Sequence, residues 1–206
     1  MASTSFKDYY KSDMIVTGIV HVGANIGQEY SSYKSLNVPI VFFEPIPKYC
    51  DHIRNNVIDE NVTVHECAIG ANTHTVTLYI ASNEGNSSSI LKTTKLLEDR
   101  HHIDFKTSIT VQQYPLDTFA SCEPCNFLII DTQGYELNVL RGAENTLKHI
   151  DYIIVEVYDD VLYEGCALFA EVNDFLISRD FVLIKKDMTW ANWGNAFYKR
   201  GTNNNG

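Results

Sequence analysis

Short apolar runs alternate with polar or amphipathic segments along the first part of the chain. Residues 15–22 and 38–44 are continuous β-rich apolar runs, the pattern of strands that are buried on both faces. The segment 25–36 between them is polar enough for a surface helix, and 48–58 spaces apolar residues four apart. The pattern therefore predicts strand, helix, strand and helix in succession.

The same alternation continues to the end of the chain. Later segments that the pattern predicts as strands are 62–70, 74–81, 108–114, 125–131, 151–158, 181–187 and 193–200. Later segments that it predicts as helices are 135–150 and 168–179, whereas 82–95 has the composition of a loop. Strands that alternate with helices predict an α/β fold with a mainly parallel sheet and helices on both faces.

Length and charge limit the size and the partners of this fold. The 206 residues, 45% hydrophobic and 20% charged, predict one domain over 1–206, with an N-terminal extension at 1–14 and a disordered tail at 200–206. The net charge of −10 argues against nucleic acid and anionic membranes as partners. Because the chain shows neither a membrane-spanning apolar run nor a secretory signal, we expect no membrane insertion and a cytoplasmic protein.

The five cysteines form an odd set without repeated spacing, as expected where thiols stay reduced. Cys122 and Cys125 have the C-x-x-C spacing of redox and zinc sites. A zinc site needs a second pair of ligands, and a redox pair opens a helix after a strand, whereas this pair precedes a strand. We therefore interpret both as loop cysteines.

Two glycines and an acid mark the ends of the first two predicted strands. Gly23 and Gly27 follow the first strand, where side chains would block a close approach of the backbone to a ligand. Glu44 ends the second strand, from which a carboxylate can accept hydrogen bonds from both hydroxyls of a ribose. Asn25 occupies the middle glycine position of a dinucleotide motif, so a cofactor without phosphates, such as S-adenosylmethionine, fits better than a dinucleotide.

Several ordered blocks resemble one known family. "VHVGANIGQE", "VFFEPIPKYCDHIRNN", "VHECAIGANTHTVTLYIASNEGNSSSI", "YPLDTF" and "FLIIDTQGYELNVLRGAENTL" are similar to successive blocks of the FkbM-type S-adenosylmethionine-dependent methyltransferases. The resemblance covers 20–158, and its most specific part is "IDTQGYELNVLRGA". It implies a Rossmann-like class I methyltransferase fold, with a seven-stranded, mostly parallel sheet whose last strand is antiparallel. It also implies methylation of hydroxyl oxygens, often on sugars, glycans or polyketide-like products.

The resemblance also implies roles for individual residues. Those expected around the methionine end and the ribose of the cofactor are His21, Gly23, Ala24, Asn25, Gly27, Glu44, Pro45 and Asp131. Those expected along the adenine or in a loop over the pocket are Glu66, Cys67, Ala68, Ser88 and Ser89. Two residues depart from the family pattern: His21 stands where many relatives have an acid, and Gln133 replaces another acid. A histidine satisfied inside the sheet is an equal interpretation of His21.

Methyl transfer to oxygen needs an aligned acceptor and a group that takes its proton. Asp131 and Glu156 end or nearly end adjacent predicted strands, so both are candidate bases, with Asp131 first. Asp131 could instead cap the following helix, and Glu136 could simply favour the N-terminus of that helix. An unpaired carboxylate within an apolar strand is costly, which favours a role for Glu156.

A divalent metal is the second possible mechanism, in which Asp131 would act with Asp159 or Asp160, as in catechol-type methyltransferases. Surface acids in an acidic chain are the simpler interpretation, and we assign no metal ligand.

The expected acceptor is a sugar or glycan, such as a nucleotide sugar or an oligosaccharide. Histidines can act as base or donor and aromatic faces pack on sugars, so the candidate acceptor residues are His101, His102, Tyr158, Trp190 and Trp193. Of these, His102 is the candidate base, although adjacent histidines also occur in solvated loops.

Two other function classes compete with this one, and the sequence argues against both. One is a non-catalytic domain that binds cofactor or glycan within a larger glycan-building protein. The other is a nucleic-acid methyltransferase, which needs a basic groove and an N/D-P-P-Y-like motif that this sequence lacks.

Overall fold

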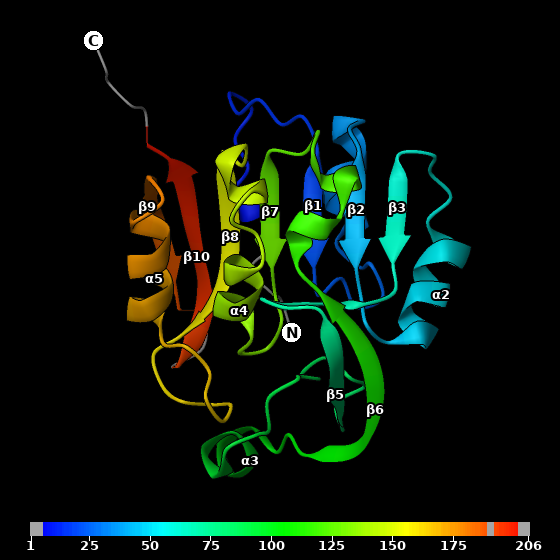
Figure 1. The fold of residues 1–206 in the computed structure, drawn as a ribbon, viewed down its shortest axis with the longest axis vertical. Coiled ribbons are helices and arrows are strands. Elements are labelled where there is room, and N and C mark those ends of the chain that lie inside the picture. The colour runs from blue at the N-terminus through cyan, green and yellow to red at the C-terminus, as the bar shows by residue number, and fades with distance from the viewer. Residues whose placement is uncertain (1–5, 189–191, 202–206) are drawn as a thin grey trace.

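The computed structural model describes residues 6–188 and 192–201, and Arg100 by its backbone alone. The candidate acceptor residue Trp190 and most of the predicted tail lie outside the described residues. Over the described ranges the chain forms a seven-stranded sheet, a three-stranded sheet and five α-helices (Figure 1).

The large sheet has the strand order β3-β2-β1-β7-β8-β10-β9. Its strands are β1 (Ile19–Val22), β2 (Ile40–Phe43), β3 (Val62–His65), β7 (Phe127–Ile130), β8 (Tyr152–Tyr158), β9 (Phe181–Asp187) and β10 (Trp193–Arg200). β3, β2, β1, β7 and β8 pair in parallel, whereas β10 runs antiparallel to both of its neighbours. The predicted mostly parallel sheet of seven strands with an antiparallel last strand is therefore confirmed.

The α-helices are α1 (Tyr30–Tyr33), α2 (Pro47–Asn56), α3 (Lys95–His101), α4 (Glu136–Arg141) and α5 (Phe169–Ile177). Short 3-10 helices lie at Phe6–Asp8, Lys34–Leu36, Leu116–Thr118, Ala120–Cys122 and Thr146–Lys148.

Helices cover both faces of the large sheet, and for this reason β1, β2, β7 and β8 are buried along their whole length. On one face, Leu140 of α4 and Leu176 of α5 pack in a core with side chains of these strands. On the other face, Tyr33 of α1 and Ile53 of α2 pack in a second core, which Phe6 of the N-terminal segment also joins. Continuous apolar runs produce such strands because neither face meets water.

The smaller sheet lies beyond the carboxyl ends of the parallel strands, together with α3 (Figure 1). Its order is β4-β6-β5, with strands β4 (Ala68–Ile69), β5 (His74–Ala81) and β6 (Phe105–Tyr114). β5 and β6 are antiparallel, and the segment between them contains the predicted loop 82–95 and then α3. This unit places that loop over the edge where parallel sheets bind ligands.

Two predicted strands differ from those of the structure. The first begins at Ile19 rather than at residue 15, since Ile15 is 76% exposed and the Thr17 N–H donates to Asn126 Oδ1 at 2.9 Å instead of pairing in a sheet. The run 62–70 divides in two, because β3 pairs with β2 of the large sheet whereas β4 pairs with β6 of the small one.

Two predicted helices are shorter than the apolar pattern indicated. In 25–36, Asn25 and Gly27 have positive φ angles that a helix does not allow, so α1 begins only at Tyr30. In 135–150, α4 ends at Arg141, and a Cβ on Gly142 would lie 2.1 Å from the backbone oxygen of Gly70. In contrast, α3 forms in a segment for which no helix was predicted.

All five cysteines are buried free thiols. Burial raises the pKa of Cys122 and of Cys125 to about 12, so neither is a reactive thiolate near neutral pH. Among the described helices, none has both the length and the apolar character that a membrane crossing requires.

Candidate active site

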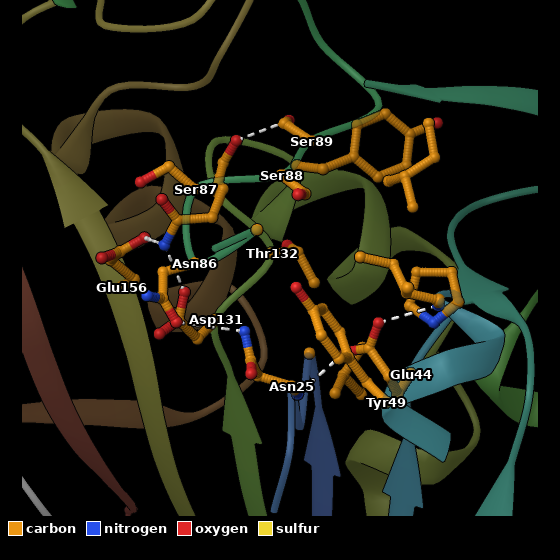
Figure 2. A pocket seen from close by; sticks show the side chains of 18 of the residues that line it. Asn25, Glu44, Tyr49, Asn86, Ser87, Ser88, Ser89, Asp131, Thr132 and Glu156 are labelled. Carbon is orange, nitrogen blue, oxygen red and sulfur yellow. Dashed lines mark hydrogen bonds between the residues drawn. The ribbon is translucent and has the colours of Figure 1, made fainter. Parts of the chain in front are cut away.

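A cavity of about 770 Å³ opens where β1, β2, β7 and β8 end. The chain passes from β1 to β2 on one side and reaches β7 on the other, so the cavity lies where the strand order reverses. Figure 2 shows Ser88 and Ser89 on one side of the cavity and Asn25 and Glu44 on the opposite side. The cavity is large enough for a nucleoside cofactor together with a small acceptor.

The turn after β1 depends on Gly23. Its φ is +87°, and a Cβ at this position would lie only 1.8 Å from the backbone oxygen of Asp131. Its N–H donates to Phe43 O at 2.9 Å, and the Asn25 N–H donates to Glu44 Oε2 at 2.8 Å. The glycine thus lets the ends of β1, β2 and β7 meet, as the sequence predicted for a tight turn.

Glu44 is held by backbone N–H groups. The Asn25 N–H bonds to one carboxyl oxygen and the Ile46 N–H, also at 2.8 Å, to the other. The residue is only 4% exposed, and burial raises its pKa to about 8, although both backbone bonds act in the opposite direction. In the ionised form each oxygen keeps acceptor capacity, so the carboxylate can bind two further donors.

Residues 82–90, which we call the serine loop, form the wall of the cavity opposite Asn25 and Glu44. Tyr49 of α2 donates its hydroxyl hydrogen to the backbone oxygen of Glu84, and Asn25 Nδ2 donates to Asn86 Oδ1 at 3.3 Å. A Cβ on Gly85 would lie 2.2 Å from the Tyr49 hydroxyl oxygen. These contacts connect the serine loop to both the glycine turn and α2.

Gln133 links two acids at the other end of the cavity. Its Nε2 donates to Asp131 Oδ1 at 2.6 Å and to Glu156 Oε2 at 2.9 Å. The residue has a φ of +56°, and its two oxygens accept hydrogen bonds, the backbone oxygen from Ser89 Oγ and Oε1 from the Tyr163 hydroxyl, both at 2.7 Å. The amide is therefore fixed from three elements.

The two linked acids differ in their protonation. Burial raises the pKa of Glu156 well above its usual range, and the charge of Asp131 adds to this effect. Burial also raises the pKa of Asp131, but the hydrogen bond from Gln133 and the nearby His21 oppose that rise. Tyr158 donates its hydroxyl hydrogen to Glu156 Oε2 as well. The pair therefore keeps one proton on Glu156, while Asp131 is the acid that ionises first.

Glu136 has a local structural role. Its Oε1 accepts hydrogen bonds from the Thr132 N–H at 2.9 Å and from the Gly134 N–H at 3.1 Å. The side chain is buried and is not among the residues that line the cavity. Glu136 thus stabilises the turn before α4, as the helix-terminus interpretation proposed.

His21 is part of a buried hydrogen-bonded chain. Tyr33 donates its hydroxyl hydrogen to Glu29 Oε2 at 2.6 Å, and the Tyr33 oxygen lies 3.1 Å from His21 Nδ1. Because the hydroxyl hydrogen is already used, we assign the ring hydrogen to Nδ1, which leaves Nε2 as an acceptor. Burial lowers the pKa of His21, although Glu29 and Asp131 oppose this, so the imidazole is neutral. His21 and Glu29 both line the cavity.

Most predicted site residues line the cavity. Those that do are His21, Gly23, Asn25, Glu44, Pro45, Cys67, Ala68, Ser88, Ser89, His102, Asp131 and Glu156, together with the acceptor candidates His101 and Trp193. Ala24 and Gly27 pack behind the glycine turn and are not lining residues. Glu66 is also outside the lining, and its carboxylate forms an exposed ion pair with Arg54 at 3.1 Å.

The acids proposed for a metal site do not form one cluster. Asp159 pairs with Lys186 at 2.6 Å, and Asp160 accepts a hydrogen bond from Asn192. In the described ranges, no three His, Cys, Asp or Glu side chains form a group that could hold a metal ion.

Several residues that shape the cavity were not predicted from the sequence. Tyr49, Asn86 and Glu29 line it, and Tyr163 holds Gln133 from a loop that carries no recognisable motif. Position was the one available signal for Glu29, since it follows the glycine turn directly. The other contacts connect segments that are far apart in the chain.

Comparison with known proteins identifies the family of this site. A sequence model described as the methyltransferase FkbM domain matches residues 21–183. The chain belongs to the FkbM methyltransferase family. The match spans β1 to β9 and includes the glycine turn, Glu44 and both linked acids. As a member of this family, the chain is an S-adenosylmethionine-dependent methyltransferase.

Relatives include two methyltransferases, one named as a 2-O-methyltransferase and one named for hexuronic acid. The 2-O-methyltransferase NoeI of Sinorhizobium fredii is 26% identical over 176 residues, which cover 80% of this chain and 72% of that protein. The hexuronic acid methyltransferase AglP of Haloferax volcanii is 24% identical over 172 residues, which cover 79% and 67%.

Solved structures agree on the fold. The methyltransferase FkbM from Methylobacillus flagellatus KT superposes with a TM-score of 0.58 at 15% identity. The alignment covers 96% of this chain and 48% of that chain, so the present chain corresponds to about half of that protein. At this identity the likeness shows the class I methyltransferase architecture alone.

Proposed function

We propose that the protein methylates a hydroxyl group of a sugar or glycan. The observation that carries the proposal is one cavity with two differently built acidic ends, a backbone-held Glu44 and an Asp131–Glu156 pair. The first end suits a ribose, and the second suits a hydroxyl that must lose its proton. The names of the relatives NoeI and AglP favour a sugar as the acceptor.

The Glu44 end fits the nucleoside part of S-adenosylmethionine. Each carboxyl oxygen of Glu44 has one protein donor, and in the ionised group each can accept a further hydrogen bond from one of the two ribose hydroxyls. Cys67 and Ala68 border the same cavity at the end of the neighbouring strand and would lie along the adenine. When bound, the cofactor supplies the methyl group from a positively charged sulfonium.

The amino-acid end of the cofactor would lie at the Asp131 side, near His21 and Glu29. The neutral Nε2 of His21 accepts a hydrogen bond but carries no charge, unlike the acid found at this position in many relatives. Glu29, joined to His21 through Tyr33, provides a carboxylate on the same wall. We propose that Glu29 supplies the negative charge that favours the cofactor ammonium group.

Asp131 is the proposed base. It ionises more readily than Glu156, and the hydrogen bond from Gln133 Nε2 fixes its orientation. A carboxylate whose pKa is raised by burial takes a proton from a hydroxyl more readily than an exposed one. Glu156, which retains its proton and shares the Gln133 Nε2 donor with Asp131, can donate that proton in a hydrogen bond to the acceptor. His102 also lines the cavity, at the C-terminus of α3, and is the alternative base.

The experiment that tests this function has two arms. Calorimetry with S-adenosylhomocysteine measures cofactor-site binding, and mass spectrometry detects products about 14 Da heavier across a panel of oligosaccharides and glycosides. We expect both binding and methylated sugar. Binding without any product would favour the non-catalytic domain, and absence of binding would contradict the whole proposal.

The Glu44→Gln variant tests the ribose contact. We expect about tenfold weaker binding of S-adenosylhomocysteine and of 5′-deoxy-5′-methylthioadenosine, because both contain the ribose diol. Unchanged affinity for both compounds would remove Glu44 from the proposed site.

A further inference from the structure

The described side chains around the cavity are strongly biased in charge. Its lining contains five acidic residues, Glu29, Glu44, Glu84, Asp131 and Glu156. Among the lining residues whose side chains are described, none is a lysine or an arginine. The cavity therefore presents acidic groups and neutral donors, with no cation among the described side chains to offset the acids.

Three side-chain donors next to the Asp131–Glu156 pair are already used within the protein. Gln133 Nε2 bonds to Asp131 and Glu156, and the Tyr158 hydroxyl bonds to Glu156. The Tyr163 hydroxyl donates to Gln133 Oε1. An acceptor carboxylate placed here would displace one of these bonds or remain next to a carboxylate without a donor, and both are costly.

A neutral hydroxyl compound meets the same groups favourably. Its hydroxyl hydrogens can be donated to Asp131, whose oxygens are acceptors. The His101 and Trp193 rings also line the cavity and lie edge to face, with ring centroids 4.6 Å apart. Such aromatic surfaces pack against the C–H groups of a sugar ring. A neutral saccharide has both the hydroxyl groups that can bond to Asp131 and the C–H groups that can pack against these rings.

We propose that the acceptor group that enters this cavity is an uncharged saccharide and that the Asp131–Glu156 pair excludes anionic sugars. The proposal rests on the sugar O-methyltransferase function proposed above and restricts its acceptor class. Uronic acids and sugar phosphates or sulfates are then poor substrates, and the diphosphate of a nucleotide sugar would have to remain outside. The acceptor class would thus differ from the hexuronic acid in the name of AglP.

The test uses three glycosides that differ only at C6. They are a methyl hexoside, the corresponding methyl hexuronide, and the methyl ester of that hexuronide, which has a similar size without the charge. Binding of each is measured by ligand-observed NMR in the presence of S-adenosylhomocysteine, and methylation by mass spectrometry with S-adenosylmethionine. We expect the hexoside and the ester to bind alike and the hexuronide at least about tenfold more weakly.

Two variants test the cause of this discrimination. Asp131→Asn removes the negative charge of the pair and should reduce the preference for ester over hexuronide by about fivefold or more in binding. Asp174→Asn removes an exposed acid on α5 and serves as the control for net charge, with the preference unchanged. An equal effect of both variants would assign the preference to the overall charge of the chain and overturn the role of the pair.

The remaining outcomes are also decisive. The proposed exclusion is overturned if the hexuronide binds as tightly as the hexoside or more tightly. It is also overturned if the uncharged ester binds as weakly as the hexuronide, because the loss then does not depend on charge. Neither result affects the proposed methylation of sugars. Absence of binding by all three glycosides overturns the proposed acceptor class. If S-adenosylhomocysteine binds and no glycoside is methylated, the proposed sugar methyltransferase function fails. The relative affinities of the three glycosides still test the exclusion of anionic sugars in that case.

Discussion

The two ends of the cavity are built in different ways. Glu44 is fixed by the backbone N–H groups of Asn25 and Ile46, which belong to the turns directly around it. The Asp131–Glu156 end is fixed by side chains, since Gln133 bridges the acids and Tyr163 holds Gln133 from a loop 30 residues away. Backbone contacts make a rigid site from local sequence, whereas side-chain contacts allow the acceptor end to differ between relatives with the same fold.

Gly23 connects the two ends, because it packs against the backbone of Asp131 and its N–H bonds to Phe43, the residue before Glu44. Its substitution therefore has the largest expected effect. Gly23→Ala would place a Cβ 1.8 Å from the Asp131 backbone oxygen at a φ of +87°, and we expect a loss of about 4 kcal/mol in the free energy of unfolding. Urea denaturation measures this loss. Gly165→Ala is the matched control, because Gly165 has a φ of +78° but no atom within 4 Å of the added Cβ.

That control separates backbone strain from steric contact. The cost at Gly165 should be about 1 kcal/mol, which is the cost of a left-handed conformation alone. Equal costs at both positions would show that the β1 and β7 ends do not approach each other as described.

The second prediction concerns the acceptor end alone. Asp131→Asn should lower kcat by about 100-fold or more, because a neutral amide cannot take the proton of the acceptor hydroxyl. Affinity for S-adenosylhomocysteine should change far less, so the effect appears in kcat rather than in cofactor binding. The pH profile of kcat provides the second readout, since the variant should lose the rise that follows ionisation of Asp131. A variant that keeps this rise would identify another base, with His102 as the next candidate.

The Glu44 end of the cavity could be predicted from the sequence more fully than the Asp131–Glu156 end. The order of strands, the glycine turn and Glu44 follow from local apolar runs and from residues close in the chain, and the structure brings them together as expected. The contacts of Gln133 could not be read from the sequence, because its positive φ and its partners Ser89 and Tyr163 depend on packing between distant segments.

The lengths of several elements also depended on distant contacts. The segment 62–70 read as one strand because its apolar pattern is continuous, but β3 and β4 find partners in different sheets. Tyr33 lies in a segment that reads as a polar surface helix, yet the N-terminal Phe6 packs on it and helps to bury it completely. Neither partner can be identified from the local pattern.

The third prediction concerns the Glu44 end and pH. The pKa of Glu44 is raised from 4.5 to about 8 in the folded protein, so the folded state binds this proton more tightly than the unfolded state. Its contribution to stability therefore falls as pH rises from 4.5 to about 8 and is constant above that range. We expect the free energy of unfolding, relative to that of Glu44→Gln, to decrease by about 4 kcal/mol across this range.

Denaturation of both proteins at several pH values gives this difference directly. The comparison with Glu44→Gln is needed because other buried acids, such as Glu136 and Glu156, titrate in both proteins. Their contributions to the free energy of unfolding cancel in the difference. A difference that stays flat between pH 4.5 and 8 would mean that the two backbone N–H groups compensate fully for the burial of Glu44.

The smallest expected effect distinguishes the amine contact from the ribose contact. Glu29→Gln removes a carboxylate that reaches the cavity beside His21, and its Tyr33 hydrogen bond can be replaced by the amide oxygen. We expect about fivefold weaker binding of S-adenosylhomocysteine, which carries the ammonium group, and unchanged binding of 5′-deoxy-5′-methylthioadenosine, which lacks it. Calorimetry with both ligands on the same variant measures this ratio. Glu44→Gln should weaken both ligands alike, so a parallel loss in Glu29→Gln would mean that Glu29 acts through the shape of the glycine turn and not through its charge.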